Sequence, residues 1–181
     1  MQSPMMPEAS IVNNSETYQH MLAHLATQDT IAIDTESNSL HAYHERVCLI
    51  QLSSPTADFL VDPFVFDNLD ELGKLFSRED IQKVFHAGDY DIGCLKRDFD
   101  FTFHNVFDTM LAATALAEPN LGLAALLEKY FGIILDKKYQ RANWGERPLK
   151  AEMLSYAQCD SHFLIPLRDT LLPQLEASNR L

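Results

Sequence analysis

Short apolar segments bounded by turn residues mark the first third of the chain. Residues 31–33 and 47–52 are two largely apolar runs separated by a polar stretch, and a third run covers 57–61. The third run follows a Ser-Ser-Pro-Thr sequence, which is typical of a turn between strands. We therefore expect the three segments to pair as an antiparallel meander.

A helical spacing of apolar residues dominates the rest of the chain. Within residues 15–25 the apolar positions recur at intervals of three and four, which is the pattern of an amphipathic helix. The same spacing predicts further helices over 69–76, 89–99, 110–116, 123–130 and 150–176, the last of them kinked or broken near Pro166.

Two more strands are expected between these helices, at residues 82–86 and 105–107. The order strand, helix, strand favours parallel pairing, so the sheet is predicted to be mixed. The expected fold class is α/β, with a mixed central sheet flanked by helices. We expect the domain to span 15–181, after a loose arm of residues 1–14 that is rich in Pro, Ser and Asn.

Composition indicates one soluble globular domain of 181 residues, with 46% hydrophobic and 22% charged residues. The three cysteines, Cys48, Cys94 and Cys159, form no C-x-x-C pair, and we expect reduced thiols in a cytoplasmic protein. No apolar run reaches the length of a membrane span, so no membrane partner is expected.

Charge is distributed unevenly along the chain. The net charge of −12 is unusual for a protein that binds nucleic acid, because such proteins generally present a basic face. Residues 128–150 nevertheless contain six basic and three acidic side chains. This basic segment could hold a phosphate chain, or it could be an ordinary solvated loop.

Acidic side chains recur at spacings that suit metal binding. Asp34 and Glu36 follow an apolar strand and share one of its faces, where two anions need a cation between them; carboxylates suit Mg²⁺ or Mn²⁺. Tyr156 and Asp160 lie one helical turn apart and could hold a water. Each feature also has a simpler interpretation: solvated acids at a strand end, a core tyrosine beside a surface acid, and, for Asp91, a first-turn helix acid.

Taken together, three segments give the sequence a recognisable resemblance. Asp34-Thr35-Glu36, then His86-Ala87-Gly88 followed by Asp91, and finally Tyr156 to Asp160 resemble the three motifs of the DEDDy 3′-5′ exonucleases, and specifically the ribonuclease D-like family. The similarity covers residues 15–176 and extends to supporting segments at 49–53, 108–109, 121–126, 138–144, 147–149 and 163–167.

The resemblance implies a ribonuclease H-like fold and a 3′-5′ exoribonuclease that releases 5′-mononucleotides from single-stranded RNA with two divalent ions, Mg²⁺ or Mn²⁺. Asp34, Glu36, Asp91 and Asp160 would hold the metals, and Tyr156 would orient the attacking water. As a further hypothesis, the substrate would contact Leu40 or His41 through terminal bases, and Lys137, Lys138, Arg141 and Arg147 through phosphates. His86 would either touch the scissile region or make a structural hydrogen bond.

Two alternatives remain open at this stage: a single-stranded DNA exonuclease with the same chemistry, and a catalytically weak nucleic-acid-binding module. No sequence feature decides RNA against DNA, because recognition of the 2′-hydroxyl depends on pocket geometry. The sequence also departs from the family. Ser37 stands where relatives commonly have an aromatic residue, and a chain ending at Leu181 leaves no room for the helical domains that follow in ribonuclease D.

Overall fold

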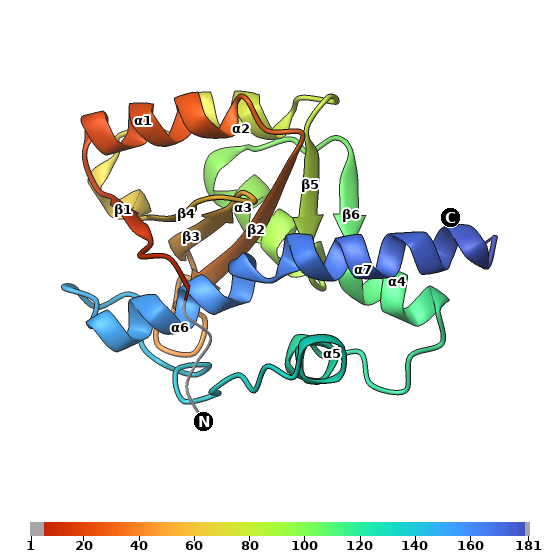
Figure 1. The fold of residues 1–181 in the computed structure, drawn as a ribbon. Coiled ribbons are helices and arrows are strands. Elements are labelled where there is room, and N and C mark those ends of the chain that lie inside the picture. Colours follow the sequence, from red (N-terminus) through yellow and green to blue (C-terminus); the bar gives the residue numbers. More distant parts are fainter. Residues whose placement is uncertain (1–5, 180–181) are drawn as a thin grey trace.

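A six-stranded mixed sheet forms the centre of the protein, whose computed structural model describes residues 6–179. The strand order is β1-β4-β3-β2-β5-β6 (Figure 1). Strands β2, β3 and β4 pair antiparallel, whereas the β1–β4, β2–β5 and β5–β6 pairs are parallel. The predicted meander and mixed sheet are confirmed, with bounds β1 Ser10–Val12, β2 Thr30–Ser37, β3 Val47–Ser53, β4 Asp58–Val61, β5 Gln82–Phe85 and β6 Val106–Asp108.

The edge strand β1 corrects the prediction of a loose arm. Ser10–Val12 pairs with β4, and the side chain of Val12 is fully buried. Asn14, also within the predicted arm, caps the next helix, since its side chain accepts a hydrogen bond from the Thr17 backbone N–H. The arm prediction is therefore wrong for residues 10–14, while residues 1–5 lie outside the described part of the chain.

Helices cover both faces of the sheet (Figure 1). One face packs its apolar side chains against α1 (Ser15–Leu25), α2 (Asp70–Phe76) and α3 (Asp89–Phe99). The opposite face contacts α6 (Ala151–His162) and α7 (Leu164–Ala177). Strand β2 divides its side chains between the two layers: Ile31 and Ile33 belong to the first core, whereas Ala32 packs near α7.

The long helix expected near the C-terminus is broken into α6 and α7 at Phe163. Pro166 lies in the first turn of α7, where its missing N–H leaves no hydrogen bond unmade, so the break precedes it. Helix α7 also packs with α4 (Thr109–Ala115) and α5 (Leu123–Phe131) around a second apolar cluster. A short 3₁₀ turn, η1 (Pro63–Val65), follows β4.

Candidate active site

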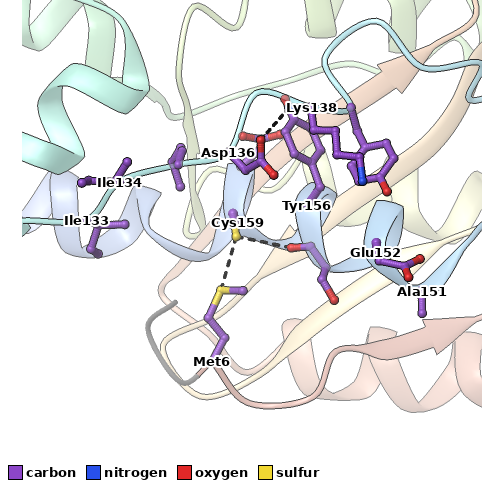
Figure 2. Close-up of a pocket in the computed structure, with 13 residues that line it drawn as sticks. Met6, Ile133, Ile134, Asp136, Lys138, Ala151, Glu152, Tyr156 and Cys159 are labelled. Atoms are coloured by element: carbon purple, nitrogen blue, oxygen red, sulfur yellow. Dashed lines mark hydrogen bonds between the residues drawn. The ribbon is translucent and has the colours of Figure 1, made fainter. Parts of the chain in front are cut away.

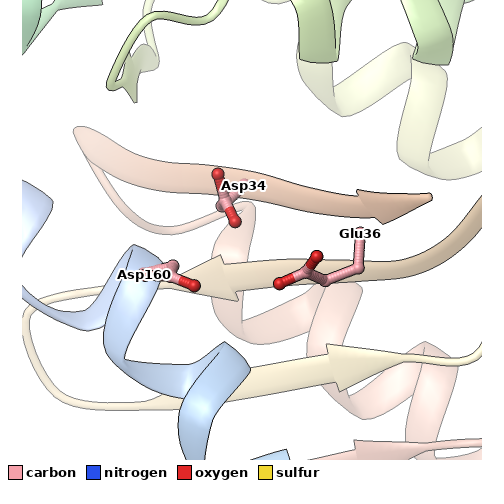
Figure 3. A group of neighbouring side chains, drawn as sticks. All are labelled: Asp34, Glu36 and Asp160. Carbon is pink, nitrogen blue, oxygen red and sulfur yellow. The ribbon is translucent and has the colours of Figure 1, made fainter. Parts of the chain in front are cut away.

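Three carboxylates from two elements meet on the face of the sheet that α6 covers. Asp34 and Glu36 follow Ala32 at alternate positions of β2, so all three point to this face. Helix α6 lies across it, with Ala157 and Ser161 buried against the sheet. Oxygen atoms of Asp34, Glu36 and Asp160 lie within 4.8 Å of one another (Figure 3).

Burial and mutual repulsion disfavour ionisation of this group. The pKa of Glu36 is raised to about 9 and that of Asp160 to about 7. Burial is the main cause of both shifts, and the charges of neighbouring carboxylates add to it. The pKa of Asp34 is also raised well above its usual range, for the same two reasons. Near neutral pH the three groups therefore need bound protons or a cation to balance their charge.

Asp91 lies beside this group but outside it. It enters from α3, on the other side of β2, and its Oδ1 accepts a hydrogen bond of 2.5 Å from Thr35 Oγ1. Burial raises the pKa of Asp91 to about 6, against the lowering effect of the Thr35 hydrogen bond. The negative charge of Asp91 in turn raises the pKa of both Asp34 and Asp160. Asp91 therefore interacts electrostatically with Asp34 and Asp160 without being part of the three-carboxylate cluster.

Tyr156 stands one turn before Asp160 on α6, in the electric field of the acids. Burial raises the pKa of its phenol, and the charges of Asp160, Glu36 and Asp34 raise it further. Its ring centroid lies 6.0 Å from that of Tyr139 and 6.2 Å from that of Trp144. The hydroxyl therefore stays protonated and remains able to donate and accept a hydrogen bond at neutral pH.

A cavity of about 450 Å³ adjoins Tyr156 and Asp160 (Figure 2). It lies between α6 and residues 133–139, and its lining is largely apolar with a few polar groups. Sequence reasoning missed most of these residues, although Glu152, Ser155 and Cys159 follow the helical spacing that places them on one side of α6. The full lining is Met6, Ile133, Ile134, Leu135, Asp136, Lys138, Tyr139, Ala151, Glu152, Ser155, Tyr156, Cys159 and Asp160.

The predicted substrate residues lie in three segments: the β2–β3 loop, the basic segment and the residue after β5. Leu40 and His41 are exposed in the loop between β2 and β3, and His41 Nε2 lies 3.0 Å from the Arg141 carbonyl oxygen. This contact joins the loop to the basic segment. Lys138 lines the cavity, with its Nζ 5.0 Å from the centre of the Tyr139 ring. His86 makes a hydrogen bond of 2.9 Å to Thr109 Oγ1, which fits the structural alternative.

Arg147 differs from the other predicted phosphate contacts, because its partly exposed guanidinium is engaged by acceptors of the protein itself. Its Nε and Nη2 donate to the Asp62 carboxylate at 2.7 and 2.8 Å. The remaining donors bind the backbone carbonyls of Cys48, Trp144 and Glu146. All five N–H groups are thereby used, so Arg147 holds the basic segment against the sheet, and a phosphate contact from it would require one of these bonds to be exchanged. The contact stays a prediction.

A family model described as 3′-5′ exonuclease matches residues 9–176. The chain belongs to this 3′-5′ exonuclease family. Among curated relatives, the exosome complex exonuclease RRP6 of Saccharomyces cerevisiae is 39% identical over 171 residues, covering 94% of this chain and 23% of the relative. The chain spans 23% or less of the first curated relatives that it matches.

Two solved exonuclease structures share the fold. The catalytic core of RRP6 from Trypanosoma brucei has a TM-score of 0.93 and 35% identity, covering 99% of this chain and 50% of that one. Escherichia coli RNase D has a TM-score of 0.90 and 27% identity, covering 97% and 47%. The ribonuclease H-like fold and the ribonuclease D-like resemblance are thus confirmed. Among the described residues, no helix is both long and apolar enough to span a membrane.

Proposed function

We propose that this chain is a metal-dependent 3′-5′ exoribonuclease that removes 5′-mononucleotides from the 3′ end of single-stranded RNA. The observation that carries the proposal is the convergence of Asp34, Glu36 and Asp160 beside Asp91 and Tyr156. The names of the relatives support the choice of RNA, since RRP6 is called an exosome complex exonuclease and RNase D an exoribonuclease involved in structured RNA processing.

The donor set fits divalent cations of the hard class. Carboxylate oxygens are preferred by Mg²⁺ and Mn²⁺, and the raised pKa values of Glu36 and Asp160 indicate uncompensated negative charge. Asp34, Glu36 and Asp160 would hold one ion, and Asp91 together with Asp34 would hold a second. When bound, such ions activate a water and stabilise the charge on the leaving oxygen. The choice between Mg²⁺ and Mn²⁺, like a cytoplasmic location, stays a prediction.

The protein's own side chains would orient the reactants. Tyr156, kept protonated by burial and the nearby carboxylates, would hold the attacking water by a hydrogen bond rather than act as a base. The cavity beside it has room for a nucleoside, and its apolar lining suits the faces of a base. Lys138 at that cavity and the exposed Arg141 would contact the phosphates of the strand that leads away.

The proposal is tested on single-stranded RNA and DNA of the same sequence, each labelled at the 5′ end. With Mg²⁺ or Mn²⁺ we expect stepwise shortening of the RNA, release of nucleoside 5′-monophosphates, and no reaction in EDTA. Asp34→Asn should lower the rate by several orders of magnitude. The control variant Asp100→Asn changes an exposed acid at the C-terminal end of α3 and should leave the rate unchanged. Faster degradation of the DNA would favour a deoxyribonuclease, and binding without cleavage would favour a nucleic-acid-binding module.

A further inference from the structure

Gln51 is a buried polar residue in contact with the candidate metal site. It lies in β3 directly opposite Asp34 of β2, so the two side chains share the face of the sheet that α6 covers. Its side chain is fully shielded from solvent. A glutamine at such a central apolar position is costly unless its amide makes hydrogen bonds, so its presence calls for a specific partner.

The amide nitrogen of Gln51 has that partner. Nε2 donates a hydrogen bond of 3.2 Å to Asp34 Oδ2. When Asp34 is ionised, as metal binding requires, the opposite amide orientation would place Oε1 against a carboxylate oxygen, and two acceptors repel each other. The contact therefore fixes both the direction of the amide and the orientation of the Asp34 carboxylate, which is shared between the two proposed metal positions.

The amide oxygen of Gln51 is left with no hydrogen-bond donor among the described residues, although it is buried. The nearby functional side chains are carboxylates, which are acceptors when ionised and offer this oxygen nothing. A hydrated divalent cation would change that, because water on a cation presents its hydrogens outward. Because the Gln51 amide contacts Asp34, water bound to a metal at Asp34 would lie near this amide and would supply the donor that Oε1 lacks.

We propose that Gln51 is a positioning residue of the metal site: its Nε2 orients Asp34, and its Oε1 accepts a hydrogen bond from the hydration shell of the cation. The inference rests on the proposed function, since it requires that Asp34 binds a divalent metal. Partners of this outer kind typically change metal affinity by about 10–100-fold when removed.

The test measures Mn²⁺ binding by isothermal titration calorimetry in the absence of RNA, with wild-type protein, Gln51→Met and Gln51→Leu. Methionine keeps the length of the side chain without its hydrogen bonds, and leucine is the second variant in case methionine disturbs folding. Leu52→Val is the matched control, because it truncates a buried residue of the same strand on the opposite face. Melting curves in EDTA establish that each variant is folded.

We expect the Mn²⁺ dissociation constant to rise by about 10–100-fold in the Gln51 variants and to stay unchanged in Leu52→Val. At saturating Mn²⁺ the KM for RNA should remain close to that of the wild type. Equal Mn²⁺ affinity in wild type and both Gln51 variants would overturn the assignment and leave the exonuclease proposal intact. Absence of Mn²⁺ binding in the wild type would overturn both.

Discussion

Replacing Glu36 by glutamine should stabilise the metal-free protein while destroying its proposed activity. Glu36 is held among other carboxylates, and burial together with Asp160 and Asp91 raises its pKa to about 9. Glutamine has nearly the same shape and carries no charge at any pH. In the absence of a cation, Glu36→Gln therefore removes an electrostatic penalty without leaving a cavity.

The size of the effect follows from the two pKa values of Glu36. In the unfolded chain the carboxyl group titrates near 4.5, so at pH 7 it is ionised there, whereas in the folded protein it is protonated. Folding at pH 7 must therefore protonate a group whose unfolded-state pKa lies about 2.5 units below the pH. At about 1.4 kcal/mol per unit, the cost is about 3 kcal/mol. Because the folded-state pKa is the higher one, wild-type stability falls as pH rises from about 4.5 towards 9. At pH 5 the cost of protonating Glu36 on folding is less than about 1 kcal/mol by the same reasoning.

Urea unfolding in EDTA at pH 5 and pH 7 measures this difference directly. We expect Glu36→Gln to exceed the wild type by about 3 kcal/mol at pH 7, equivalent to roughly 6–12 °C in melting temperature, and by little at pH 5. Glu176→Gln, an exposed change on α7, is the control and should show no gain. Saturating Mn²⁺ should reverse the order at pH 7. A gain that is absent at pH 7, or equal at both pH values, would refute the argument.

Three other variants separate structure, binding and chemistry. Arg147→Met should lower the free energy of unfolding by about 2–4 kcal/mol, because it leaves the Asp62 carboxylate unpaired. It should change RNA binding only through the position of the basic segment, so the salt dependence of binding should stay the same. Lys138→Glu with Arg141→Glu should weaken RNA binding and reduce its dependence on salt; an unchanged salt slope would count against phosphate contacts. Tyr156→Phe should lower kcat by about 10²-fold without altering calorimetric Mn²⁺ affinity, and a loss of metal binding would contradict its assigned role.

The fold was largely predictable because most of its elements are long enough to show a period. Helical spacing of apolar residues predicts α1 and its buried face within residues 15–25. Alternation around Ile31 and Ile33 does the same for β2. Strand β1 could not be predicted in this way. Three residues are too few to show an alternation, and Ser10–Val12 is a strand only because β4 offers an edge to pair with. Its existence depends on a partner about 50 residues away.

Local spacing predicted which site residues share a face of β2 and which share a side of α6, but it did not predict that these two groups lie together in the fold. Alternation along β2 puts Asp34 and Glu36 on one face, and helical spacing puts Tyr156 and Asp160 on one side of α6. Only the resemblance to a nuclease family brought the two groups together. In the structure they meet because α6 packs its small buried residue Ala157 against the sheet, which brings the adjacent turn over β2.

The basic segment shows why charge alone could not identify a substrate-binding residue. By sequence, Arg147 and Arg141 are equivalent cations in one stretch, yet the side chain of Arg147 binds Asp62, 85 residues earlier in the chain. A guanidinium whose five donors are engaged by the protein adds charge to the surface field, but it must give up a hydrogen bond before it can bind a phosphate. We therefore expect phosphate contacts from Lys137, Lys138 and Arg141, which are exposed beside the cavity or the loop that carries His41. Arg147 would affect RNA binding only by keeping that segment in place.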